Sequence, residues 1–144
     1  MVRIREEQRR KLTDIPFIER IAGLLRGRYG DTVITLPSGD IAIGAIPDIR
    51  LRELIATGIA RARRHGMTWE SSLGQFIFLM FIISPNFDSD PDVLPVLGDE
   101  RIPSDERINA LWNYVDDELF SAIRLDYDPA AWEMIEQPEP PRNQ

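Results

Sequence analysis

The chain has 144 residues, of which 43% are hydrophobic and 28% are charged, and it contains no cysteine. This composition is typical of one globular domain and excludes a disordered chain, a disulfide-stapled chain and thiolate metal ligands. The net charge of −7 is unevenly distributed, because residues 1–66 hold 13 basic and 8 acidic residues whereas residues 67–144 hold 4 and 16. Either these two parts complement each other within the fold, or the acidic part is a surface that meets a basic partner.

The N-terminal region predicts helical structure followed by a β-rich segment. Residues 3–12 predict a short polar helix, and Pro16 predicts a helix start or a sharp kink near Asp14. In "DTVITLPSGDIAIGAIP", residues 31–47, β-branched residues flank the turn sequence "PSGD". We therefore expect a small β-hairpin or an extended loop at 32–46.

Two helices are predicted next. With Asp48 as its cap, the first has an apolar stripe at positions 51, 54, 55, 58, 59 and 62, where Gly58 permits close approach of another helix. The second is capped by Thr68 and is apolar nearly all round from Leu73 to Ile83, which is typical of the central helix of a bundle.

The C-terminal region predicts one more long amphipathic helix. It starts at the cap Ser104 and extends over residues 104–127. Its apolar stripe consists of Ile108, Leu111, Trp112, Val115, Leu119, Ala122 and Ile123. Asp128 and Pro129 form a further cap-plus-proline signal, and residues 137–144 are a polar, proline-rich tail.

These patterns together predict an all-α fold. We expect a compact bundle of five to six helices in a single domain, residues 1–136, followed by a disordered tail, residues 137–144. The N-terminus lacks the apolar stretch of a secretory signal, and the apolar run 76–83 falls short of the roughly 20 residues that cross a bilayer. We therefore expect a cytoplasmic protein without membrane contact.

The loop after the central helix carries three alternating acids, Asp88, Asp90 and Asp92. An EF-hand has such a pattern, but it also needs glycine at position 6 and glutamate at position 12, where this chain has Val93 and Asp99. We interpret the loop mainly as a helix end and the start of the next turn. Calcium or magnesium binding and partner contact are the two alternatives.

Other polar residues give weak signals for chemistry. His65, the only histidine, falls in the last turn of a predicted helix, where the helix dipole favours a cation, and no matched nucleophile or carboxylate accompanies it in sequence. Asp116, Asp117 and Glu118 fall opposite an apolar stripe, as a solvated face or as a docking surface for a basic protein. The basic run "RARRHG" is too short to indicate nucleic-acid binding in so acidic a chain.

Several segments carry a resemblance to known proteins. They are "RIREEQ", "GIARARRHGMTWE", "FIFLMFIISPNFD", "VLGDERIPSDERINAL" and "YDPAAW", within residues 3–133. The chain resembles a group of small, mostly uncharacterised bacterial proteins encoded beside the spike and effector genes of type VI secretion systems.

The resemblance implies a non-enzymatic, protein-binding role. The partner would be an effector or toxin encoded beside this chain, and the chain would act as its immunity protein or as an adaptor or chaperone. We expect no catalytic residues, metal site or cofactor, and name as partner-binding candidates Asp88, Asp90, Asp92, Asp116, Asp117 and Glu118. The alternatives are an uncharacterised enzyme using carboxylates and a divalent-cation-binding module built on the Asp88–Asp92 loop.

Overall fold

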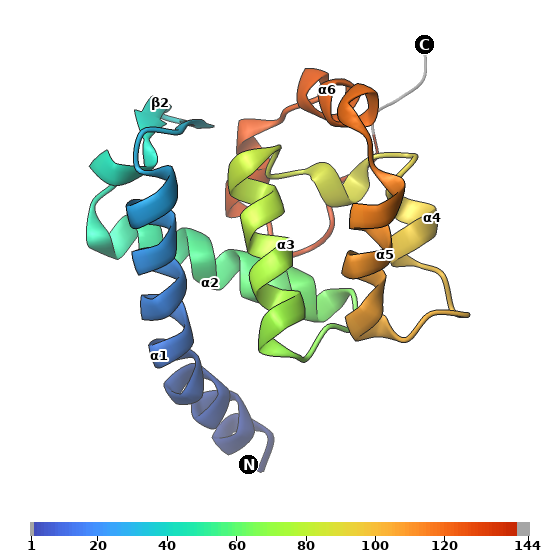
Figure 1. Ribbon diagram of the computed structural model, residues 1–144. Coiled ribbons are helices and arrows are strands. Elements are labelled where there is room, and N and C mark those ends of the chain that lie inside the picture. The colour runs from blue at the N-terminus through green and yellow to red at the C-terminus, as the bar shows by residue number, and fades with distance from the viewer. Residues whose placement is uncertain (1, 141–144) are drawn as a thin grey trace.

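Six α-helices and one small sheet form the computed structural model, which describes the backbone of residues 2–140 and the side chains of residues 14–140 (Figure 1). The helices are α1 (Val2–Tyr29), α2 (Asp48–Arg64), α3 (Glu70–Ile82), α4 (Leu94–Leu97), α5 (Arg107–Tyr114) and α6 (Asp117–Leu125). Short 3₁₀ turns lie at η1 (Ile43–Ala45), η2 (Phe87–Ser89), η3 (Ser104–Glu106) and η4 (Pro129–Glu133). The predicted helical bundle with a small hairpin is confirmed.

Helix α1 is continuous through Pro16, so the predicted helix start near Asp14 is wrong. Proline removes one backbone donor, and Figure 1 shows the axis bending along the first part of the helix. Tertiary contacts hold the helix on both sides of Pro16, because Phe17 is buried and Asp14 accepts two hydrogen bonds of 2.8 Å from Arg63 of α2. This carboxylate raises the pKa of Arg63.

The predicted hairpin forms from β1 (Val33–Leu36) and β2 (Gly39–Ala42), which pair antiparallel with Val33 opposite Ala42. Gly39 follows the turn at a φ of +127°, a conformation that disfavours other residues. Two-stranded hairpins are marginal alone, and this one is fastened to the C-terminal segment. The indole of Trp132 and the hydroxyl of Tyr127 both donate to the Thr35 carbonyl, at 3.1 and 3.0 Å.

Helices α2 and α3 cross at the centre of the molecule, and Figure 1 shows α3 between α1 and α5. The whole predicted stripe of α2 is buried, as is most of α3. A Cβ at Gly58 would lie 3.0 Å from Ile77 and 3.2 Å from the Met80 sulfur, so the predicted close helix approach is confirmed. No helix within residues 2–140 combines the length and the apolar character needed to cross a bilayer.

Three predicted caps are wrong. Ser104 is the first residue of η3 and makes no capping hydrogen bond, and Asp48 and Thr68 also fail as caps. Pro47, not Asp48, precedes α2, and the Asp48 carboxylate instead pairs with Arg26 at 2.7 Å. Thr68 does not cap α3, since its hydroxyl and its backbone N–H donate to Asp105, at 2.8 and 2.6 Å. The carboxylate of Asp105 also accepts from the N–H of Trp69 at 2.8 Å, so a residue 36 positions away ties down the start of α3.

The predicted long helix over residues 104–127 is broken into η3, α5 and α6. The break lies at Val115 and Asp116, which both have extended backbones, and the Asp116 side chain accepts from the Leu119 N–H at 2.9 Å as the cap of α6. Ile108, Leu111 and Ile123 are buried as the stripe predicted, but Trp112 is 40% exposed. Aspartate competing for a cap position explains why the apolar spacing alone was misleading.

Candidate functional site

The three acids of the Asp88–Asp92 loop diverge in the folded protein. Asp88 is fully buried and Asp90 is 6% exposed, whereas Asp92 faces solvent. The Asp90 side chain accepts from the N–H of Asp92 at 2.8 Å and thereby turns the loop. Burial raises the pKa of Asp90, and that N–H opposes the rise by lowering it. Burial of Asp88 and Asp90 is at odds with their predicted direct contact to a partner.

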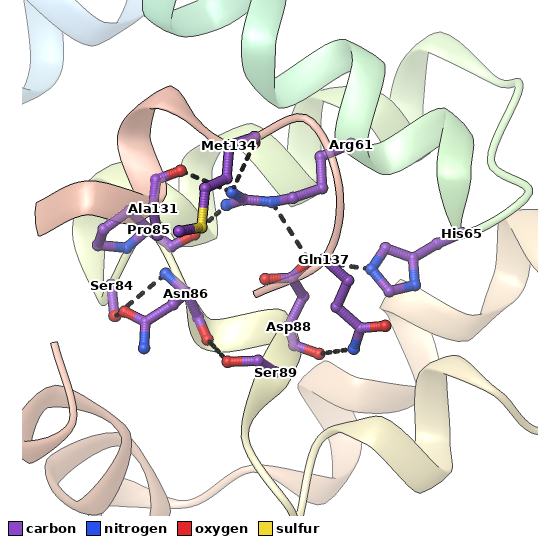
Figure 2. A network of polar contacts seen from close by, with 10 residues as sticks. All are labelled: Arg61, His65, Ser84, Pro85, Asn86, Asp88, Ser89, Ala131, Met134 and Gln137. Atoms are coloured by element: carbon purple, nitrogen blue, oxygen red, sulfur yellow. Dashed lines mark hydrogen bonds and ion pairs between the residues drawn. The ribbon is translucent and has the colours of Figure 1, made fainter. Parts of the chain in front are cut away.

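Asp88 pairs with Arg61, a cation that is not among the predicted site residues. Its Oδ2 lies 3.2 Å from Nε of Arg61, as an ion pair without an aligned hydrogen bond, and both side chains are fully buried. The same Oδ2 lies 3.0 Å from Nε2 of His65, at the C-terminal end of α2 (Figure 2). A carboxylate only accepts hydrogen bonds, so Nε2 of His65 carries the hydrogen.

Arg61 connects three segments of the chain (Figure 2). One terminal nitrogen donates to the carbonyls of Ala131 and Met134, at 2.8 and 3.1 Å, and the other donates to the carbonyl of Pro85. Burial lowers the pKa of Arg61, and the charge of Asp88 opposes this by raising it. A guanidinium remains charged in proteins, so Asp88 supplies the compensating charge that the buried cation requires.

The C-terminal segment closes this cluster. Gln137 donates to the backbone carbonyl of Asp88 at 2.8 Å, and the following Pro138 is buried. The start of the predicted disordered tail is thus packed on the loop, while residues 141–144 lie outside the described residues. His65 therefore has the carboxylate partner that the sequence did not reveal, but the Asp88 carboxylate is inaccessible to a substrate.

Neighbouring side chains of the loop form a second polar network. The Asn86 amide donates to the Asp126 carbonyl at 2.8 Å, and its oxygen accepts from the Asp128 N–H at 2.9 Å. Ser89 donates to the Asn86 carbonyl at 2.9 Å. These bonds join the loop to the end of α6, and we assign a structural role to the buried part of the loop.

The remaining four candidates are exposed, and three of them come together. Asp92, Asp116 and Glu118 line one open depression of about 390 Å³ beside Tyr114, and Asp117 adjoins them at the first position of α6. These residues, Asp92, Asp116, Asp117 and Glu118, are called the acidic face below. Asp116 and Asp117 lie at the cap and first turn of α6, where they are exposed, whereas Ile123 of the same helix is buried.

The geometry does not favour the cation-binding alternative. Asp88 is committed to Arg61 and His65, Asp90 to its own loop, and Asp92 to the acidic face. Within the part of the chain whose side chains are described, no group of three or more histidine or carboxylate side chains is placed to hold a metal ion.

One sequence signal could have identified Arg61. It lies three residues after Gly58 and seven after Leu54, on the apolar stripe of α2, where a charge must be paired or hydrogen-bonded. Its partner Asp88 is 27 residues further along the chain, and no spacing rule links two such positions.

No protein-family model matches this chain, and no curated protein or solved structure shows significant similarity to it.

Proposed function

We propose that this chain is a non-enzymatic, protein-binding accessory of a type VI secretion effector module. Its partner is an effector or toxin encoded beside it, and it acts as the immunity protein or as the adaptor that delivers the effector. The resemblance of residues 3–133 motivates the secretion context. The single observation that carries the binding role is the acidic face, where two separate segments bring three exposed carboxylates into one depression, with exposed Asp117 next to two of them in the chain.

The acidic face suits a basic protein surface. Three of its four carboxylates line one depression, in a domain whose residues 67–144 hold 16 acidic and only 4 basic residues. Such a field accelerates encounter with a positively charged partner, and salt screens it. Toxins that act on nucleic acids or nucleotides often have basic active sites, which an acidic immunity protein would cover.

Co-purification tests the proposal. The tagged chain is expressed with each neighbouring gene product, and a stable stoichiometric complex with one of them is expected. The rate constant for association should be about tenfold lower at physiological or higher salt than at low salt. Growth of cells that express the partner, with and without this chain, then separates an immunity protein from an adaptor.

A pair of charge variants locates the binding surface. Asp117→Lys with Glu118→Lys should slow association markedly, whereas Asp31→Lys with Glu139→Lys makes the same change in net charge at exposed sites elsewhere. Equal effects of both pairs would mean that only net charge matters. Absence of any complex with the wild-type chain would overturn the proposed function.

A further inference from the structure

A second surface of the molecule is an apolar groove between α1 and α3. One wall presents Ile21, Leu24 and Arg28 of α1, and the facing wall presents Gln75, Phe78 and Ile82 of α3. The two adjoining hollows of the groove share Gln75 and Phe78, and the larger has a volume of about 430 Å³. The walls follow the same helical spacing, since steps of three and four residues separate the three residues on each.

The groove leaves large apolar side chains in water. Leu24 and Trp112, which line it from α1 and α5, are each 40% exposed. The floor closes at Gly74, where a Cβ would lie 3.5 Å from the Ile21 side chain. An exposed apolar furrow that is rimmed by polar groups marks a binding surface.

Two polar groups along the groove lack partners. The Gln75 Oε1 atom is buried and accepts no hydrogen bond among the described residues, which is rare for a buried amide oxygen. Arg28 lies at one end of the groove, and the Arg20–Glu70 ion pair lies at the other. No carboxylate of residues 14–140 pairs with Arg28. The facing helix offers none, because residues 71–87 contain no charged side chain.

The walls favour a helix over an extended peptide as occupant. Backbone donors and acceptors within α1 and α3 are satisfied inside each helix, so an added strand would find no groups to pair with and would bury its own unpaired. A helix satisfies its backbone internally and presents only side chains. From Ile21 to Arg28 the wall extends over about 10 Å, which two turns of a third helix would cover.

We infer that this groove binds an amphipathic helix of the effector partner, with an Asp or Glu of that helix paired to the exposed Arg28. The inference rests on the proposed function for the identity of the partner. The chain would then have a second contact surface besides the acidic face. This surface is apolar, with the positive charge of Arg28 at one end.

The test uses the full chain and the neighbouring gene product that co-purifies with it. A photo-crosslinking residue is placed at position 24 in one preparation and at the exposed Val33 in another. Crosslinks from position 24 should map to one amphipathic helical segment of the partner, and position 33 should give none. Leu24→Glu and Arg28→Glu should each weaken the complex about tenfold or more, whereas Val33→Glu and Arg64→Glu, matched changes outside the groove, should leave it within about twofold.

Charge exchange gives the decisive readout. Replacing the acid of the crosslinked partner helix by lysine should restore binding to the Arg28→Glu chain and weaken binding to the wild-type chain. Thermal unfolding confirms that the exposed Arg28→Glu variant folds. A wild-type complex that is unaffected by both groove variants would overturn this inference and leave the proposed function standing; no complex at all would overturn the proposed function, and the groove inference with it.

Discussion

Asp88 and Asp117 are the same residue type in the same acidic half of the chain, yet the fold uses them in opposite ways. Asp88 is fully buried against Arg61 and His65, whereas Asp117 stands exposed on the acidic face at the start of α6. The difference teaches that acidity along a sequence is not a property of one surface. Some acidic residues compensate buried donors such as those of Arg61, and only the remaining, exposed acidic residues can contact a partner.

The largest expected effect comes from removing the inward carboxylate. Asp88→Ala leaves the Arg61 guanidinium buried without a counter-charge, and breaking such a pair costs about 3–5 kcal/mol of unfolding free energy. Asp92→Ala, in the same loop but exposed, should cost less than about 0.5 kcal/mol. Urea unfolding followed by circular dichroism measures both. Similar losses of unfolding free energy at the two positions would contradict the distinction between the buried Asp88 and the exposed Asp92.

Asp105 is intermediate between the two classes, because its carboxylate is partly exposed and caps the start of α3. Asp105→Ala should cost about 1–2 kcal/mol at pH 7, as the loss of a helix cap does. Desolvation would raise the pKa of Asp105, but the N–H groups of Trp69 and Thr68 outweigh it and lower the pKa.

The pH dependence of Asp105 follows from that lowered pKa. Its contribution is fully present above the unfolded-state value of about 4 and is lost as the pH falls through the folded value. The stability difference between wild type and Asp105→Ala should therefore shrink between pH 5 and pH 2. A difference that stays constant over this range would show that the carboxylate charge is not what holds Thr68 and Trp69.

Asp90 should show the opposite sign. Burial raises its pKa in the folded state, so ionisation destabilises the fold as the pH rises from about 4 through that value, and the penalty persists at pH 7. Asp90→Asn retains an oxygen for the Asp92 N–H and removes the charge, which should stabilise the protein at pH 7 by up to about 1 kcal/mol. Unfolding at pH 7 and pH 3 checks this, since the gain should vanish at the lower pH. A loss at pH 7 would show that the charged form is needed.

The smallest effects on stability should come from the acidic face. Asp117→Asn and Glu118→Gln remove charges that favour the N-terminal turn of α6, each at a cost of about 0.3–0.5 kcal/mol. Both should nevertheless slow association with the partner, which stopped-flow fluorescence at low salt would detect. Slowed association with nearly unchanged unfolding would sharpen the contrast with Asp88, whereas a large loss of stability would contradict it.

Much of the fold follows from local pattern in the sequence. The stripe of α2, the apolar α3, the hairpin around "PSGD" and the cap Asp128 were predicted, because each depends on residues within a few positions of one another. The errors have two causes. Asp116 divides a predicted helix through a local cap on the Leu119 N–H, whereas Asp105 holds the start of α3 from 36 residues away, beyond the reach of any local pattern.

The candidate site was predictable only in part for the same reason. Asp92 and the Asp116–Glu118 run were both identified, but their meeting in one depression depends on how α4, α5 and α6 turn back on one another. The pairing of Arg61 with Asp88 depends on how α2 packs against a loop 27 residues further along the chain. The charge distribution along the chain indicates that opposite charges can pair within the domain. Three-dimensional packing decides which acidic and basic residues form those pairs.

The donors of Arg61 have a consequence for the order of biosynthesis. Two of their acceptors, the carbonyls of Ala131 and Met134, belong to the last segments of the described chain to leave the ribosome. A nascent chain that has exposed α1, α2 and α3 therefore carries an arginine in its forming core with those acceptors still missing. Final closure of this domain therefore waits until residues 131–134 have emerged, and fragments that stop before residue 131 should be poor folders and ready substrates for proteases.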